Sequence, residues 1–217
     1  MKHINTIIFD LDGTLIDSSD GVVEAVNYSL EQMGEPLQTA ETIKPFIGFP
    51  LSVMYPYFTK KPIKELYHHF QVKATDTVVA STIILPLVEE VLDQLKESGY
   101  TMTIASTKIR KHITGVIDKF GWERYFVDYS GGDEVKHVKP APDIFALMLE
   151  KIQADKSKSI VVGDTINDIH AAQAIPIPVV AVHSPYGNKD EVIESKPDYC
   201  IDTIDQLPSL LRGEPVG

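Results

Sequence analysis

The stretch Thr6-Ile7-Ile8-Phe9-Asp10-Leu11-Asp12-Gly13-Thr14 decides the fold of this chain. It begins with four β-branched or aromatic residues, which is typical of a short buried strand. Two carboxylates follow at positions i and i+2, and because side chains alternate along an extended chain, both can face one site. An isolated Asp-x-Asp-Gly is more often a polar turn in which Gly13 permits an unusual backbone angle. The functional interpretation therefore depends on partners elsewhere in the sequence.

Similar apolar runs recur along the chain, with helical patterns between them. Strands are predicted at residues 6–9, 101–105, 125–127, 160–162 and 179–182. One helix is predicted from the apolar stripe of Leu87, Val88, Val91, Leu92 and Leu95, which Gly99 ends, and another begins at Ile144. Strands that alternate with helices indicate an α/β fold, with a parallel sheet covered by helices on both faces.

Residues 18–84 interrupt this alternation. We find no convincing strand there, whereas Val22, Val23, Val26 and Leu30 repeat at helical spacing, and residues 63–70 do so later. A small all-helical unit inserted after the first strand is the economical interpretation. It would lie beside the carboxyl edge of the sheet, where open α/β folds bind their ligands.

The composition excludes several classes of protein. The chain has 217 residues, with 31 Asp and Glu against 20 Lys and Arg, and its net charge of −11 speaks against a nucleic-acid partner. The single cysteine, Cys200, fits a reducing compartment. The N-terminus lacks the apolar region of a signal peptide, and no run is long enough to span a bilayer. We expect a cytoplasmic protein without a membrane partner.

Further polar residues follow the predicted strands. In Gly163-Asp164-Thr165-Ile166-Asn167-Asp168, the first carboxylate stands at a strand tip and the second one helical turn later. Four carboxylates at one sheet edge repel one another unless a cation lies among them, and an all-oxygen set suits Mg²⁺ better than zinc. Ser106 and Lys139 would supply the hydroxyl and ammonium groups that phosphoryl oxygens require.

Each of these residues also has an ordinary structural explanation. The segment at Asp164 and Asp168 could be a capped helix start, Ser106 a helix cap, and Lys139 a solvated charge. The functional interpretation gains its weight from the ordered combination.

That combination, Asp10-x-Asp12-x-Thr14, Ser106, Lys139 and Gly163-Asp164-x-x-x-Asp168, resembles the four motifs of the haloacid dehalogenase (HAD) superfamily of aspartate-nucleophile hydrolases. The segment from Gly132-Asp133 to Lys139-Pro140-Ala141-Pro142-Asp143 adds to the resemblance, which spans the whole chain. It implies a Rossmann-like catalytic core at residues 1–16 and 85–217, with a small helical cap domain of the C1 type at residues 17–84.

The resemblance also implies catalytic roles. Asp10 would be the nucleophile, Asp12 the general acid and base, and Ser106 and Lys139 would hold phosphoryl oxygens. Asp10, the backbone carbonyl of Asp12, and Asp164 would hold Mg²⁺. Asp168 would orient this group or bind the ion through water. The presence of Asp12 favours phosphoryl chemistry, because relatives whose leaving group is a halide lack an acid at that position. The predicted substrate contacts are Thr14, Thr107, Gly48 and Phe49.

The cap loop at residues 45–51 is similar to that of phosphoglycolate phosphatases and bacterial pyrophosphatases. Phe46 and Phe49 could pack within the cap or contact substrate. Beta-phosphoglucomutases and phosphonoacetaldehyde hydrolases have a cationic cap residue shortly after the glycine of this loop. No Lys or Arg follows Gly48 closely in this sequence, which argues against both. Ser106-Thr107-Lys108 departs from the Thr-Asn-Lys that is common in phosphoglycolate phosphatases, so the resemblance does not identify the substrate.

The predicted function is hydrolysis of a small phosphorylated metabolite, led by 2-phosphoglycolate-like monoesters. The alternatives are a pyrophosphatase or a nucleoside monophosphatase, then a mutase, then a non-catalytic binding module. The retained carboxylates argue against the binding module. A monomer and a homodimer are both compatible with the sequence. We expect the seven histidines to be surface or packing residues, with His137 the one to test.

Overall fold

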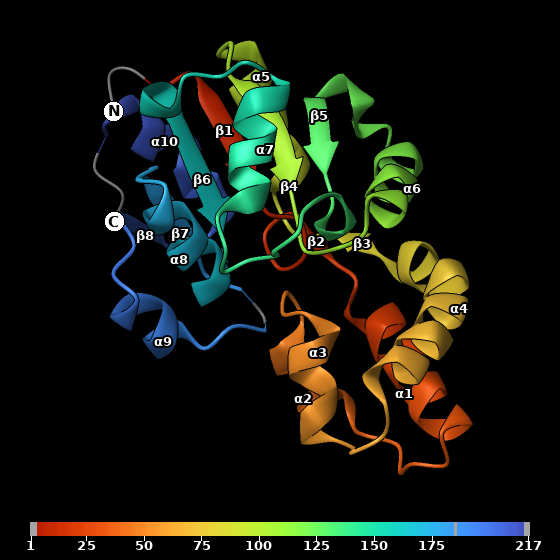
Figure 1. Cartoon of the computed structure of the whole chain (residues 1–217). Helices are drawn as coiled ribbons and strands as arrows, with labels where there is room; N and C mark the ends of the chain where they lie inside the picture. The colour runs from red at the N-terminus through yellow and green to blue at the C-terminus, as the bar shows by residue number, and fades with distance from the viewer. Residues whose placement is uncertain (1–3, 185, 215–217) are drawn as a thin grey trace.

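The computed structural model describes residues 4–184 and 186–214, and these form a parallel sheet with helices on both faces and a helical insert at one end (Figure 1). All pairings within the six-stranded sheet are parallel. In spatial order its strands are β5 (Phe126–Ser130), β4 (Thr101–Ala105), β1 (Thr6–Phe9), β6 (Ser159–Gly163), β7 (Val179–Val182) and β8 (Tyr199–Ile201). The fold class predicted from the sequence is confirmed.

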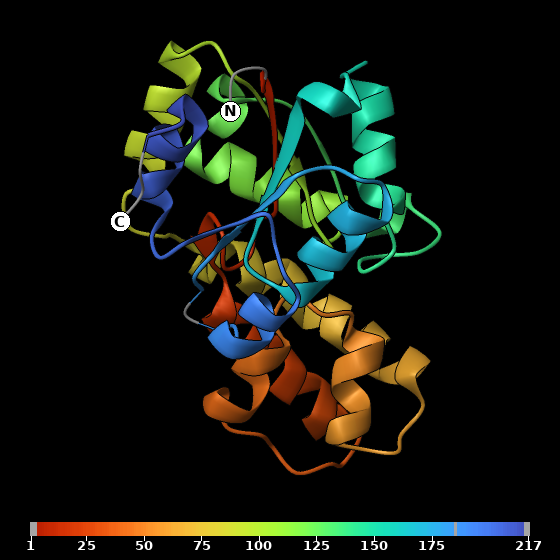
Figure 2. The ribbon, with the colours of Figure 1, turned by 90° about the vertical axis from the view of Figure 1, so that its left-hand side faces the viewer.

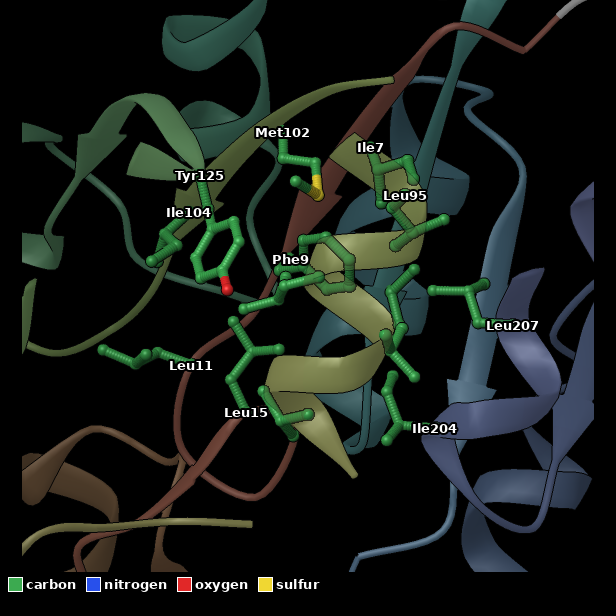
Figure 3. Packing of buried hydrophobic residues seen from close by; sticks show 14 of the residues in the cluster. Ile7, Phe9, Leu11, Leu15, Leu95, Met102, Ile104, Tyr125, Ile204 and Leu207 are labelled. Atoms are coloured by element: carbon green, nitrogen blue, oxygen red, sulfur yellow. The ribbon is translucent and has the colours of Figure 1, made fainter. Parts of the chain in front are cut away.

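Alternation along the central strand β1 explains the layers. Ile7 and Phe9 point to one face of the sheet and Ile8 points to the other, and all three are fully buried. Figure 3 shows Phe9 packed among Leu95 and other apolar side chains on the first face. That face is covered by α5 (Val88–Glu97), α6 (Arg110–Phe120) and α10 (Leu207–Arg212). The opposite face is covered by α7 (Asp143–Lys151) and α8 (Ile166–Ala174), with α9 (Lys189–Glu194) packed on α8.

Residues 19–81, which we call the helical insert, come shortly after β1 in the sequence. Its helices are α1 (Ser19–Gln32), α2 (Ala40–Ile43), α3 (Leu51–Met54) and α4 (Ile63–Ser81). The two long helices α1 and α4 pack against each other around an apolar core of their own, which includes Val26, Leu30, Leu66 and Phe70. Figures 1 and 2 both place the insert beyond the end of the sheet toward which the strand arrows point.

A short antiparallel pair connects the helical insert to the sheet-forming part. β2 (Ile16–Asp17) precedes α1, and β3 (Ile83–Ile84) follows α4. The sequence predicted no strand here, because two-residue strands carry too little periodicity to be recognised. The two connections between the helical insert and the sheet-forming part therefore lie side by side.

Three local expectations are corrected by the structure. β5 begins one residue later than predicted and extends to Ser130, and the short edge strand β8 has no counterpart in the prediction because only its last residue, Ile201, is buried. Leu87 does not belong to the apolar stripe of α5, since it precedes the helix with a φ of 65° and is exposed.

Candidate active site

Three polar residues lie together because they follow adjacent parallel strands. Asp10 comes directly after β1, Ser106 after β4 and Asp164 after β6, and β1 lies between the other two strands. All three side chains are buried. The carboxyl edge of the sheet therefore gathers the two acids and the hydroxyl that the sequence predicted to be neighbours.

Lys139 joins this group from the loop that precedes α7. Its Nζ donates hydrogen bonds to Asp10 Oδ1 at 2.7 Å and to Asp168 Oδ1 at 2.6 Å. The side chain is almost completely buried, and its ammonium lies 5.0 Å from the ring centroid of Phe145. One cation thus holds two carboxylates that are far apart in the sequence.

Burial is the main cause of the shifted pKa values of the carboxylates at this edge. Burial raises the pKa of Asp10 to about 7, against the opposing charge of Lys139. Burial, together with the charge of Asp10, raises the pKa of Asp164 well above its usual range. Burial alone would lower the pKa of Lys139, but the charges of Asp10 and Asp168 outweigh it and raise that pKa.

Asp12 lies beside the same edge and is held by a second lysine. Lys108 Nζ is 3.0 Å from Asp12 Oδ2, and both side chains are nearly buried. Ser18, which precedes α1, donates its hydroxyl to Asp12 Oδ1 and accepts a hydrogen bond from Lys108 Nζ at 3.3 Å. The carboxylate predicted to be the general acid is therefore tied to the start of the helical insert.

The donor set at this edge fits a hard divalent cation. Carboxylate oxygens of Asp10, Asp164 and Asp168 lie within 4.8 Å of one another. With Asp12 there are four buried carboxylates but only two nearby ammonium groups, those of Lys108 and Lys139, so full ionisation would leave two negative charges in excess. Oxygen ligands with this charge suit Mg²⁺. Asp12 has no side-chain oxygen in the cluster, so its predicted contribution through the backbone carbonyl stays a prediction.

Two glycines allow these groups to approach closely. Gly13 has a φ of +81°, and a Cβ there would lie 2.1 Å from Asp164 Oδ2. A Cβ on Gly163 would lie 2.6 Å from Cβ of Asp168. Any side chain at either position would displace a carboxylate, so the glycine of the first motif does more than permit a turn.

Thr14 and Thr165 orient the acids on the β6 side. Thr14 Oγ1 donates to Asp164 Oδ1 at 3.1 Å. The backbone N–H and the hydroxyl of Thr165 donate to Asp168 Oδ2 at 3.1 and 2.7 Å, so Asp168 also caps α8. Thr14 is buried and is not among the residues that line the cleft described next, and its predicted substrate contact stays a prediction.

A cleft of about 420 Å³ lies between the helical insert and the carboxyl edge. Asp12, Gly48, Phe49 and Thr107 are among its lining residues. Thr107 Oγ1 donates to the carbonyl of Gly48 at 3.2 Å, and a Cβ on Gly48 would lie 3.1 Å from Thr165. Phe46 lines the cleft and also packs its ring against Tyr57 and Phe58. Its position is therefore compatible with both predicted roles, packing within the cap and contact with substrate.

Sequence reasoning missed two residues beside the site, Lys108 and His112. Both line the cleft, Lys108 from the loop that follows β4 and His112 from the first turn of α6. A signal was present for Lys108, because it directly follows the predicted pair Ser106 and Thr107. His112 is buried, as expected of a packing residue, but it packs beside the cleft. His137, the histidine singled out from the sequence, lies outside this cleft and contacts Asp143 at 3.0 Å.

Comparisons with known proteins point to one family of hydrolases. A family model described as haloacid dehalogenase-like hydrolase matches residues 7–182. A phosphoglycolate phosphatase from Vibrio parahaemolyticus is 27% identical over 220 residues, covering 95% of each chain. A pyrophosphatase from Bacillus mycoides is 30% identical over 213 residues, covering 96% of this chain and 98% of its own.

The solved structures include a close match in fold. The crystal structure of a haloacid dehalogenase-like hydrolase from Bacteroides fragilis, whose assignment is described as putative, has a TM-score of 0.89 at 28% identity. It covers 94% of this chain and 99% of its own. No helix in the described part of the chain is both long and apolar enough to cross a membrane.

Proposed function

Because the chain belongs to the haloacid dehalogenase-like hydrolase family, we propose that it is a phosphatase that hydrolyses small phosphomonoesters in a Mg²⁺-dependent reaction through an aspartyl phosphate. The observation that carries this proposal is the placement of Asp10. Its carboxylate stands at the carboxyl end of the central strand, 2.7 Å from the buried Lys139 ammonium and beside Asp164. A nucleophilic carboxylate needs such a cation to approach an anionic phosphate.

Asp10 and Asp12 would divide the chemistry between them. Asp10 attacks phosphorus, and the ester bond on the opposite side breaks. Asp12 gives the leaving oxygen a proton, and as a base it then takes one from the water that hydrolyses the aspartyl phosphate. The contacts of Asp12 with Lys108 and Ser18 support this role, because they would orient the carboxyl group that carries the proton.

The remaining residues would bind and orient. Ser106 and Lys139 hold phosphoryl oxygens, and Lys139 also keeps Asp10 in place through its hydrogen bond. Mg²⁺ would be held by Asp10, the backbone carbonyl of Asp12, and Asp164, with Asp168 as an orienting group, and when bound it would supply positive charge to the phosphoryl oxygens.

We also propose that the chain divides into a catalytic core and a cap domain. Residues 17–84 would act as a cap that closes over the site, and residues 1–16 and 85–217 as the catalytic core. The pairing of Ile16–Asp17 with Ile83–Ile84 supports a hinge at this place, because both connections lie side by side. Closure would exclude bulk water while the leaving group is protonated.

Phosphate release with and without Mg²⁺ tests the function. The panel should contain 2-phosphoglycolate, pyrophosphate, a nucleoside monophosphate and several sugar and alkyl monophosphates. Pyrophosphate is included because a relative at 30% identity is named a pyrophosphatase. We expect release from monoesters, its loss in EDTA and its recovery with Mg²⁺.

The matched variants are Asp10→Asn and Asp118→Asn. Asp118 is exposed on α6, so its amide variant changes the same net charge away from the site. We expect Asp10→Asn to lose turnover while keeping its unfolding midpoint, and Asp118→Asn to retain activity. Retained turnover in Asp10→Asn would overturn the assignment of the nucleophile. A chain that binds Mg²⁺ but hydrolyses none of the compounds would revive the binding-module alternative.

A further inference from the structure

The cleft beside Asp12 has walls of a distinct chemical character. Phe46 and Phe49 line it from the helical insert, together with Leu51 at the start of α3. Ile63 and Tyr67, one helical turn apart on α4, also line it and are 39% and 42% exposed. Exposed large apolar side chains that converge on one cavity are unusual on a soluble surface and mark binding sites.

The loops at the carboxyl edge of the sheet continue this apolar lining. Ile109 and Val138 line it, next to the polar group formed by Asp12 and Lys108. The cavity therefore has a charged end at the proposed general acid and an apolar body that extends under the helical insert. A phosphomonoester would place its ester oxygen at the charged end and its organic part in the body.

The positive charges of the cleft are poorly placed for an anionic leaving group. Among its described lining residues the lysines are Lys64 and Lys108, and there is no arginine. Lys108 is already paired with Asp12, and Lys64 lies exposed to water. A carboxylate moved into the apolar body would lose its hydration without gaining a buried partner, which is costly.

His112 adds no positive charge to this apolar surrounding. It is among the lining residues but is only 5% exposed, and its Nε2 is enclosed by the protein. Burial, with the charges of Lys108 and Lys111, lowers its pKa to about 4, so the ring is neutral near pH 7. An anionic leaving group would therefore gain no partner from this histidine.

Resting on the proposed phosphatase function, we infer that the preferred substrate is a phosphomonoester of an uncharged alcohol with a ring-sized apolar body, which the apolar side chains of the cleft would cover. The ester bond broken is that between phosphorus and this alcohol oxygen, which leaves with the proton of Asp12 as a neutral alcohol. Water then releases inorganic phosphate from Asp10. This substrate class differs from 2-phosphoglycolate, whose leaving group carries a carboxylate.

The first experiment compares benzyl phosphate with 2-phosphoglycolate and ethyl phosphate, since all three release a primary alcohol. Burial of a phenyl ring predicts that kcat/KM for benzyl phosphate exceeds the other two by roughly 10- to 100-fold. If phosphate is released but 2-phosphoglycolate or ethyl phosphate is preferred, the inference is overturned and the phosphatase function stands. No release from any of the three, or from the wider panel, would instead overturn the proposed function.

The second experiment adds a cation to the cleft wall. Phe49→Lys places an ammonium in the lining, and Val72→Lys places the same charge on an exposed position of α4 outside it. We expect Phe49→Lys to shift the ratio of kcat/KM values toward 2-phosphoglycolate by about tenfold or more, and Val72→Lys to leave the ratio unchanged. An equal ratio in both variants would mean that the leaving group does not enter this cleft.

Discussion

At the carboxyl edge of the sheet, buried charged side chains are held by short hydrogen bonds, as between Lys139 and both Asp10 and Asp168. In the adjoining cleft, apolar side chains such as Ile63 and Tyr67 are partly exposed. Removing one partner of a buried ion pair is costly, whereas a partly exposed apolar side chain can be exchanged at little cost. We therefore expect changes at the edge to alter turnover and stability, and changes in the cleft to alter the choice of substrate.

The largest expected effect tests the charged edge. Asp12→Asn should lower turnover of alkyl phosphates by about 10²- to 10⁴-fold, because the leaving alkoxide is no longer protonated. The loss should be smaller for the formation of the aspartyl phosphate from p-nitrophenyl phosphate, whose leaving group needs no proton. A rapid-quench burst of p-nitrophenol measures this step. An equal loss with both substrates would remove Asp12 from the role of general acid.

The next prediction concerns stability at the same edge. Lys139→Met leaves Asp10 and Asp168 buried without their cation, which should lower the free energy of unfolding by about 3–5 kcal/mol. Urea unfolding in EDTA measures it. Lys158→Met is the control, since its pair with Asp155 is half exposed and about 1 kcal/mol or less is expected. Similar losses in both variants would contradict the contrast between the edge and the exposed surface.

A pH-dependent prediction concerns His112, at the boundary of edge and cleft. Its pKa is lowered from 6.5 to about 4, mainly by burial. As the pH falls through this interval the unfolded chain binds a proton that the folded chain does not, so stability falls by up to about 3 kcal/mol and returns as the pH rises. Urea unfolding of His112→Phe should lack this component. Parallel pH curves for the two proteins would show that His112 titrates normally.

The smallest effect is expected in the cleft. Thr107→Val removes the hydrogen bond to the carbonyl of Gly48 and loosens the loop against the edge. We expect KM to rise about two- to tenfold with kcat nearly unchanged. Thr75→Val, which removes a hydroxyl from the exposed face of α4, is the matched control. A large fall in kcat would indicate that Thr107 belongs to the reacting edge.

Much of the site could be predicted because its motifs follow strands. Asp10, Ser106 and Asp164 each come after an apolar run, and parallel strands bring such positions to one edge. The contact of Lys139 with Asp10 spans 129 residues, and the resemblance, rather than the local pattern, indicated it. The pairing of Lys108 with Asp12 and the burial of His112 were not predicted, since both depend on how α6 packs beside the first motif.

The sequence alone determined the alternation of strands and helices, the all-helical insert and the identity of the acids, because periodicity and motif spacing are local properties of the chain. Only the tertiary structure decided which cation holds which acid, that Thr14 orients Asp164, and that a cleft with a charged end and an apolar body lies beside them. These features arise from contacts between residues distant in sequence. Their burial and partners depend on packing, which no local pattern encodes.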